Sequence, residues 1–214
     1  MHIANRRTTL ALTLLTCAIR VQAAPMSFKD SAMLMGDLSG NWQELQSNYA
    51  FTTRDAIGGS ITRMRPDDGR PEERLIQAEY TRRLMRWNQP DSQSNLWLIS
   101  GIGQWQDAHR THPMLTPGIQ ADYETTRVYA SALARLYRAD GVQRDVVSSR
   151  FGVSFFEAAY EDTQPWVVLE VRRMHDVSAR IEATPMLRLV NRRFFAELGM
   201  SQSAHLRANF MYTF

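Results

Sequence analysis

The chain has 214 residues, of which 44% are hydrophobic and 22% are charged, and its formal net charge is +3. Arg6, Arg7 and Arg20 lie in the first 23 residues, which contain no acidic residue, so 22 basic residues face 22 acidic ones in the remainder. This balance excludes the basic footprint of a nucleic-acid-binding protein. Because Cys17 is the single cysteine, residues 24–214 have neither a disulfide nor a thiolate metal site.

The first 23 residues have the pattern of a secretory signal peptide. Arg6 and Arg7 precede an apolar run over residues 9–19, and Val21 and Ala23 occupy the small-residue positions before a cleavage site. We predict cleavage after Ala23 and a short N-terminal leader over residues 24–30. The apolar run is shorter than the roughly 17 apolar residues that a membrane-spanning helix needs.

From residue 31 onward, short alternating segments recur at the spacing of hairpins, separated by clusters of Asp, Gly, Asn, Pro and Arg. This pattern predicts one all-β domain over residues 31–214. We expect twelve strands, near residues 31–37, 42–52, 56–65, 75–87, 95–105, 114–124, 127–138, 146–157, 165–174, 180–190, 194–201 and 205–214. The first segment alternates least regularly. Since bacterial barrels have even strand numbers, ten strands would remain without it.

The last ten residues alternate between an apolar and a polar face. The apolar face consists of Leu206, Ala208, Phe210, Tyr212 and Phe214. The polar face consists of Arg207, Asn209, Met211 and Thr213. Ten alternating residues are the length of a tilted strand that crosses a bilayer, with lipid on one side and a hydrated lumen on the other.

This tail resembles the closing strand of Gram-negative outer-membrane β-barrel proteins, in which a C-terminal Phe after alternating apolar residues is read by the barrel-assembly machinery. The resemblance implies an outer-membrane location among lipid and lipopolysaccharide. It also implies an assembly signal formed by Phe210, Tyr212 and Phe214, and a periplasmic C terminus. With twelve strands, both termini are periplasmic. We therefore expect a single antiparallel up-and-down transmembrane β-barrel, with short loops on both sides and no loop long enough for a large plug.

Aromatic residues gather near the predicted strand ends, as they do at membrane interfaces. The periplasmic set is Tyr49, Phe51, Trp87, Trp97, Tyr123, Phe155, Trp166, Phe194, Phe195, Tyr212 and Phe214. A smaller set, Trp42, Trp105 and Tyr137, marks the outer ends. We predict that both sets form girdles that face the lipid headgroups.

Two residues disturb the alternation. Arg82 falls on the lipid-facing parity, which predicts a β-bulge near Arg82 and Arg83. Pro185 lies in mid-strand, where it removes a backbone donor from the ladder. Glycines at positions 58, 59, 101 and 103 indicate sharp curvature or close packing within strands, because no glycine-rich loop leads into a helix that could bind a phosphate.

Charged residues share the inward parity. The predicted lumen-lining anions are Glu44, Glu79, Asp122, Glu124, Glu170, Glu182 and Glu197. The predicted lumen-lining cations are Arg83, Arg135, Arg150, Arg172, Arg188 and Arg207. Such balanced rows favour ion pairs across the lumen that narrow the bore. We expect a narrow porin-like channel for small polar, charged or zwitterionic solutes, without a cofactor. The alternative is a closed structural or accessory barrel.

An enzyme is an alternative of a different class. Some twelve-stranded outer-membrane barrels resemble lipid or lipopolysaccharide hydrolases with Ser and His near the outer rim. The candidates here are Ser201, Ser203 and His205, with Glu197 in the same hairpin. A nucleophile needs a base within hydrogen-bond reach and a group that orients that base, and spacing in a hairpin does not establish either.

A metal site is the third possibility. His109 and His112 share a predicted outer loop with Asp107, and His175 and Asp176 occupy another. Imidazole and carboxylate groups suit divalent metals. Solvated loop histidines are the simpler interpretation, so we predict no metal.

Overall fold

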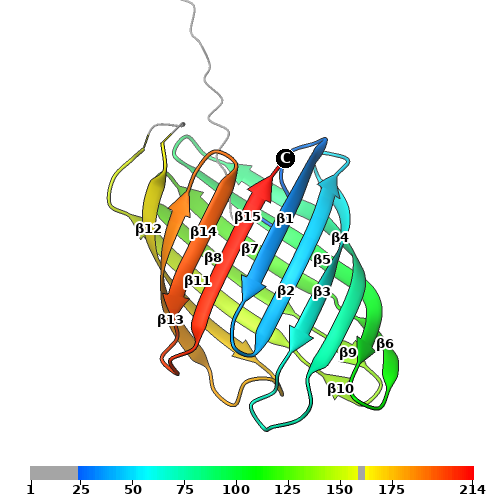
Figure 1. The fold of residues 1–214 in the computed structure, drawn as a ribbon. Helices are drawn as coiled ribbons and strands as arrows, with labels where there is room; N and C mark the ends of the chain where they lie inside the picture. Colours follow the sequence, from blue (N-terminus) through cyan, green and yellow to red (C-terminus); the bar gives the residue numbers. More distant parts are fainter. Residues whose placement is uncertain (1–23, 159–161) are drawn as a thin grey trace, which may run out of the picture.

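The computed structural model describes residues 24–158 and 162–214, which form a closed antiparallel β-barrel (Figure 1). β1 (Ser31–Leu38) pairs with β2 (Trp42–Ala50) on one side and with β15 (Leu206–Thr213) on the other, and this last pairing closes the ring. The predicted all-β barrel is therefore confirmed, including its first strand. The described residues contain no helix long and apolar enough to cross a membrane. The predicted signal peptide, with its cleavage site after Ala23, consists of residues 1–23, which lie outside the described residues.

Twelve strands run around the ring in chain order, as predicted, and three of them are interrupted once. The uninterrupted strands are β1, β2, β3 (Asp55–Met64), β4 (Glu73–Asn88), β5 (Ser92–Gln106), β12 (Gln164–Met174), β13 (Glu182–Val190), β14 (Phe194–Met200) and β15. The interrupted strands are β6 (Thr111–Leu115) with β7 (Gly118–Thr125), β8 (Val128–Arg135) with β9 (Arg138–Ala139), and β10 (Val142–Gln143) with β11 (Val146–Ser154). The first break contains Pro117, which has no backbone donor for a ladder.

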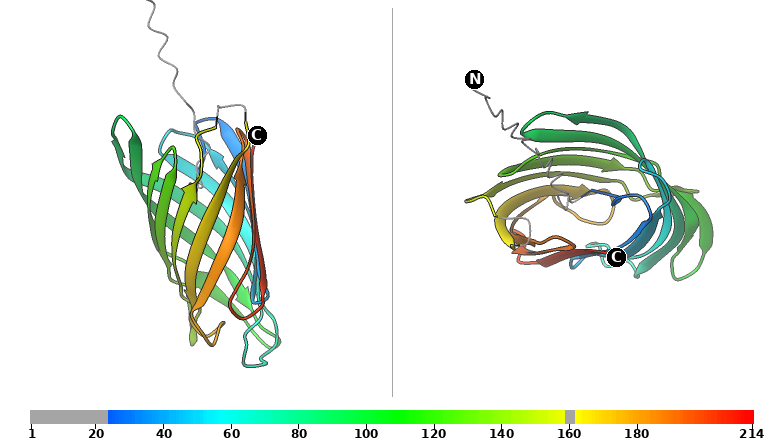
Figure 2. Two further views of the ribbon diagram at one scale, coloured as in Figure 1. Left: turned by 90° about the vertical axis from the view of Figure 1, so that its left-hand side faces the viewer. Right: turned by 90° about the horizontal axis from the view of Figure 1, so that it is seen from above.

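The strands are tilted, and their ribbons form a ring when the barrel is seen from above (Figure 2). Side chains alternate between the outer surface and the lumen, because successive residues of a strand point to opposite faces. In β15, Leu206 is exposed while Arg207 and Asn209 are buried inside the ring. The outer surface is dominated by exposed Leu, Ile, Val and Phe side chains, which suits contact with lipid acyl chains.

The barrel accommodates both irregularities predicted from the sequence, at Arg82 and at Pro185. The register of β4 against β5 shifts between Arg83 and Met85, which confirms a bulge one residue beyond the predicted position. Arg82 stays on the outer face, where Nη1 lies 3.1 Å from Oδ1 of Asp55. Pro185 pairs with Leu169 in the β12–β13 ladder, whereas the β13–β14 ladder begins one residue later, at Met186, as expected beside a residue without a backbone donor.

The predicted aromatic girdles are only partly correct. In the set that was predicted to be periplasmic, eight residues are exposed, namely Tyr49, Phe51, Trp87, Tyr123, Phe155, Phe194, Tyr212 and Phe214. The other three, Trp97, Trp166 and Phe195, are buried inside the barrel. At the opposite end, Trp42, Trp105 and Tyr137 are also buried inside, so the prediction of a girdle there is wrong. These six residues occupy positions whose side chains point inward in the two-residue period of a strand. That period decides which face of the sheet a side chain takes, whatever its distance to the rim.

Candidate functional site in the barrel lumen

The lumen is packed with apolar side chains at the rim opposite the C terminus, which we call the far rim. These inward-facing residues form one buried cluster, the far-rim plug: Trp42, Met64, Leu75, Trp105, Met114, Tyr137, Val142, Val146, Met174 and Val177. The rings of Trp42 and Tyr137 meet edge to face, with centroids 5.4 Å apart. Such packing has the character of a protein core and leaves no wide aqueous bore at this level.

Val177 completes the far-rim plug from the turn between β12 and β13, and only 1% of its surface is exposed. Its carbonyl accepts a hydrogen bond of 2.9 Å from the backbone N–H of Asp67, and Asp67 Oδ2 accepts one of 2.9 Å from the N–H of Ala179. Arg70 donates a hydrogen bond of 2.6 Å to the backbone carbonyl of Asp176, and Nη1 of Arg144 lies 3.3 Å from Oδ2 of Asp176. A short turn therefore closes this rim, although the sequence contains no loop long enough for a large plug.

The N-terminal leader occupies the lumen near the C-terminal rim. Ala24 and Met26 are buried in a cluster with Ala50, Ala56 and Trp97. The Asn48 side chain holds this segment by donating a hydrogen bond of 2.8 Å to the carbonyl of Pro25. The leader is thus part of the folded barrel.

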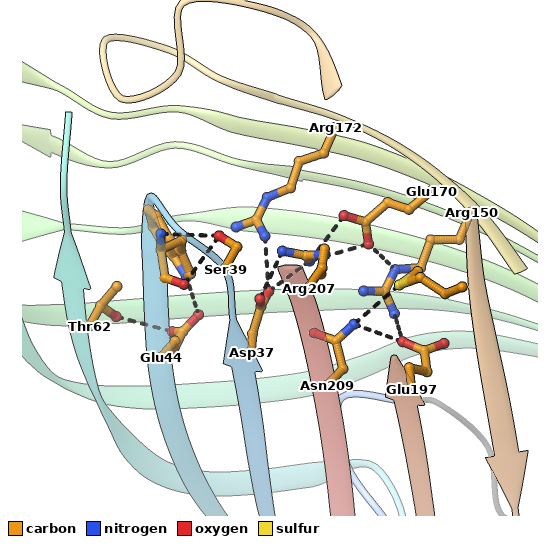
Figure 3. Close-up of polar contacts among 12 residues, drawn as sticks. Asp37, Ser39, Glu44, Thr62, Arg150, Glu170, Arg172, Glu197, Arg207 and Asn209 are labelled. Carbon is orange, nitrogen blue, oxygen red and sulfur yellow. Dashed lines mark hydrogen bonds and ion pairs between the residues drawn. The ribbon is translucent and has the colours of Figure 1, made fainter. Parts of the chain in front are cut away.

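Between the two ends lies a connected set of ion pairs (Figure 3), which we call the ion-pair belt. It consists of Asp37, Arg150, Glu170, Arg172, Arg188, Glu197 and Arg207. The nitrogen–oxygen distances run from 2.5 Å for Arg150–Glu170 and Arg188–Glu197 to 3.2 Å for Arg150–Glu197. Asn209 adds a hydrogen bond of 2.8 Å to Glu197.

Several pairs of the belt join strands that are not neighbours in the ring. Asp37 on β1 contacts Arg172 on β12 at 3.0 Å, and Arg207 on β15 contacts Glu170 on β12 at 3.0 Å. These pairs brace the barrel across its interior. Charges held in such an interior require partners, and the belt supplies them to both signs.

A second polar cluster lies on the opposite wall around Glu79. Its Oε1 lies 2.5 Å from Nη2 of Arg135, which also donates a hydrogen bond of 3.0 Å to Thr116. The residues that complete the shell of Glu79 are Gln46, Ser60 and Gln77. Because Arg135 is on β8 and Glu79 on β4, this pair also crosses the lumen.

A further ion pair lies beside the far-rim plug. Arg144 Nη2 lies 2.6 Å from Oε1 of Glu73, and Trp105 donates a hydrogen bond of 3.2 Å to the same carboxylate. The sequence interpretation missed Asp37, Glu73 and Arg144 as lumen residues, because they fall at the ends of predicted strands or in predicted loops. Continuing the alternation of inward-facing residues to the ends of the predicted strands, and two residues beyond them, would have found all three.

The remaining predicted lumen residues lie inside the ring but outside the belt. Asp122 accepts hydrogen bonds from Asn95 at 2.6 Å and Trp97 at 2.5 Å. Glu182 lies 3.4 Å from Nδ1 of His205, and the guanidinium of Arg83 lies 5.8 Å from the Trp97 ring centre. Glu124 lies near the end of β7 and is half-buried.

A cavity of about 190 Å³ lies between the belt and the Glu79 cluster. Its charged lining residues are Asp37, Glu44, Arg135, Arg150, Glu170, Arg172 and Arg207. Polar lining groups include Gln46, Ser131 and Ser148, and Ala24 and Pro25 of the leader form part of its boundary. The arrangement offers a small polar solute donors and acceptors of both signs within an otherwise packed barrel.

The proposed hydrolase residues do not assemble into a triad among the described residues. The hydroxyl of Ser201 accepts hydrogen bonds of 3.3 Å from the backbone N–H groups of Ser203 and His205, which is a turn contact. The His205 ring contacts Glu182, not a serine hydroxyl. Glu197 is engaged by Arg150 and Arg188. The nucleophile–base–acid relay that a serine hydrolase needs is therefore not formed by these contacts.

The proposed metal ligands lie in separate local contacts. His112 stacks against Trp105, with ring centres 6.0 Å apart. Asp107 accepts hydrogen bonds of 2.7 Å from the backbone N–H groups of His109 and Arg110, and these donors hold the pKa of Asp107 below its usual range. The described part of the chain contains no cluster of three His, Cys, Asp or Glu side chains suited to a metal ion.

No protein-family model matches this chain, and no curated protein matches it. Among solved structures, the chain is similar to KdgM porin in complex with disordered oligogalacturonate, with a TM-score of 0.50 and 10% identity, covering 86% of this chain and 99% of that chain. A second KdgM porin structure has the same identity and coverage and a TM-score of 0.49. The chain therefore has an overall barrel fold similar to that of KdgM porin. At this identity the similarity concerns the fold alone.

Proposed function

We propose that this chain is a Gram-negative outer-membrane β-barrel that forms a narrow, gated passage for small polar or charged solutes. The observation that carries the proposal is the ion-pair belt beside a cavity with charged lining residues, inside a barrel whose outer surface is apolar. An apolar exterior suits the bilayer, and opposed charges in the lumen discriminate among solutes by charge.

The far-rim plug serves as the gate in this proposal. Hydrophobic constrictions close channels because water does not wet them. Trp42, Trp105 and Val177 form such a constriction in this proposal. The hydrogen bond from Arg70 to the carbonyl of Asp176 and the ion pair of Arg144 with Asp176 hold the turn that carries Val177. In this proposal the passage is closed while this turn packs at the far rim, and it opens when the turn leaves the rim.

The orientation follows from the terminal strand. We propose that the C-terminal rim faces the periplasm, that both termini lie there after removal of residues 1–23, and that lipid and lipopolysaccharide surround the barrel. We also propose that Phe210, Tyr212 and Phe214 engage the barrel-assembly machinery. Phe214 is well placed for recognition, because 65% of its surface is exposed.

Single-channel recording in planar bilayers tests the passage. We expect brief openings of low conductance from the folded wild-type barrel, and longer openings from Trp105→Ala, which removes a bulky side chain from the far-rim plug. The matched control is Trp87→Ala, because Trp87 is exposed on the outer surface. If neither the wild type nor Trp105→Ala conducts above background, the chain is not a channel.

A closed accessory barrel is the second candidate, and the packing at both ends of the lumen favours it. The same recordings separate the two candidates. A closed barrel remains silent after the plug is weakened, whereas a gated passage responds to that change.

A further inference from the structure

Two outward-facing arginines lie side by side on the outer surface at the far rim. Arg63 on β3 and Arg74 on β4 are direct partners in the β3–β4 ladder, and both residues are exposed. Facing residues of a ladder have Cβ atoms about 5 Å apart, so like charges at such positions repel each other. The pair lies one residue inside the strand ends at Met64 and Glu73. A bound anion between the two guanidinium groups is therefore favourable.

The carboxylates of the same hairpin neutralise this pair only in part. Glu72 is shared, because its Oε2 lies 2.9 Å from Nε of Arg65 while its Oε1 lies 3.8 Å from Nε of Arg63. Arg74 forms no ion pair within the described part of the chain. The other three acids of the hairpin bind elsewhere, namely Asp67 to Asn41 and Ala179, Asp68 to Arg70, and Glu73 to Arg144. Three exposed arginines therefore share one carboxylate.

The arginine pair is the centre of a polar row that crosses β2 to β6, strands that are neighbours in the ring. On one side of the pair, Gln43 of β2 is the ladder partner of Arg63. On the other side, Gln106 of β5 is the partner of Arg74, and Thr111 of β6 follows it. Amide and hydroxyl groups beside two guanidinium groups suit a headgroup that carries both phosphate and sugar hydroxyls.

Next to this polar row, the outer surface becomes apolar and then hollow. Two residues along their strands from the arginines, Ile61 and Ile76 face each other and are 42% and 48% exposed. Beyond them lies a largely apolar groove of about 1010 Å³. Its lining includes the small residues Ser47 and Ala78 and the larger, exposed side chain of Ile102. A row that binds phosphate and an apolar groove beside it are the two parts of a site for a phosphorylated lipid.

We propose that this outer face binds lipopolysaccharide, with one phosphate of its lipid A headgroup between Arg63 and Arg74. An acyl chain of the same molecule lies along Ile61 and Ile76 and enters the groove at Ala78. Arginine binds phosphate through two parallel N–H donors, and the negative charge relieves the repulsion between the two guanidinium groups. The assignment rests on the proposed orientation of the barrel, in which the far rim lies in the outer leaflet.

Native mass spectrometry of the folded barrel in detergent tests this site, with added diphosphorylated lipid A and its dephosphorylated form as probes. We expect saturable binding of the diphosphorylated form and at least about tenfold weaker binding of the dephosphorylated one, which lacks the charge-assisted contacts. Arg74→Gln should weaken binding of the diphosphorylated form at least about tenfold. Arg74→Lys keeps the charge but loses the paired donors, so it should restore part of the affinity.

The matched control for Arg74→Gln is Arg173→Gln. Arg173 is also exposed near the far rim, but its partner in the β11–β12 ladder is Val147, so no second arginine faces it there. Its removal should leave lipid A binding nearly unchanged. Heat-dependent mobility on gels and circular dichroism establish that each variant is folded before binding is measured.

Ala78→Phe tests the apolar part of the site, because it fills the groove and leaves the arginines in place. It should weaken lipid A binding at least about threefold. Its control is Ala196→Phe, since Ala196 is exposed on β14, outside the lining of the groove. A dimer of the barrel that Ala78→Phe dissociates would show that a second copy occupies this face, and it would overturn the proposal.

The proposal is also overturned if dephosphorylated lipid A binds as tightly as the diphosphorylated form, or if Arg74→Gln binds lipid A as tightly as Arg173→Gln. Phosphatidylglycerol is the competing lipid, and equally tight binding of it would show a general phospholipid site instead. A membrane-impermeant thiol reagent on intact cells should label Ala108→Cys, in the far-rim hairpin between β5 and β6. Labelling only after the outer membrane is opened would overturn the assignment to lipopolysaccharide.

The failure of this site and the failure of the passage are separate results. A barrel that conducts but does not bind lipid A refutes the site and leaves the passage intact. A barrel that binds lipid A but stays silent in bilayers refutes the passage and supports the site.

Discussion

Arg172 and Asp37 meet across the lumen, with Nη1 of the first 3.0 Å from Oδ2 of the second. The pair connects β12 to β1, beside the seam where β1 closes on β15. Asp37 also binds Arg207 of β15 at 3.0 Å. One carboxylate therefore links both strands of the barrel seam to β12, and these ion pairs add interior contacts to the β1–β15 ladder that closes the ring.

The Asp37 contacts predict a large effect of Asp37→Asn. The substitution leaves the buried guanidinium groups of Arg172 and Arg207 without this counter-charge. Because the Asp37 side chain is itself 28% exposed, we expect a cost of about 1–3 kcal/mol. Urea unfolding in lipid vesicles should show a loss of this size. Asp30→Asn is the control, since Asp30 is an exposed partner of Lys29 and should change stability little. Equal stability of the two variants would show that Asp37 is not a brace.

The far-rim plug predicts a change of gating in Val177→Ala. Loss of two buried methyl groups weakens the closed state by about 2 kcal/mol, which corresponds to a rise in open probability of up to about 30-fold. Bilayer recordings measure this directly. Val171→Ala removes the same atoms from the lipid-facing side of β12 and should leave gating unchanged. A rise of the same size in both variants would contradict the proposed gate.

The close approach of β2 and β3 predicts that Gly58→Ala is destabilising. A Cβ at position 58 would lie 2.0 Å from the carbonyl oxygen of Ser47 and 2.7 Å from Cα of Asn48, so the backbone of β2 would have to move. Overpacking of this kind costs about 1–3 kcal/mol. In Gly40→Ala, the nearest neighbour is the His205 ring at 3.4 Å, so unfolding measurements should show little change. A tolerated Gly58→Ala would mean that β2 is free to shift.

The proposed assembly signal predicts that Phe214→Ala impairs assembly in cells without weakening the folded barrel. Phe214 packs edge to face on Tyr212, with ring centres 4.8 Å apart, but most of its surface is exposed. The yield of protein in the membrane fraction should therefore fall, whereas the free energy of unfolding measured in vitro should stay nearly unchanged. Phe155→Ala removes an equally exposed ring from another part of the barrel and should preserve the yield. A normal yield of Phe214→Ala would remove the assembly role.

Most of the fold is predictable from local alternation. Each inward or outward position depends on the two-residue period of a strand, so residues such as Arg207 and Leu206 in β15 could be assigned without knowing their neighbours. The aromatic residues at the strand ends follow the same two-residue period, although we predicted that they face the lipid headgroups. Trp42 shares the parity of Glu44, and that parity places both inside the barrel, although Trp42 lies at a strand end.

The sequence by itself determined the number of strands, their order and which side chains turn inward, because these depend on short-range periodicity and on hairpin spacing. Only the tertiary structure decided that Asp37 meets Arg172 and that Glu79 meets Arg135, because contacts across the lumen depend on the tilt and register of strands far apart in the chain. It likewise decided which side chains pack together at the far rim. Whether Val177 fills the far rim depends on the combined volume of side chains from many strands, and no local pattern contains that sum.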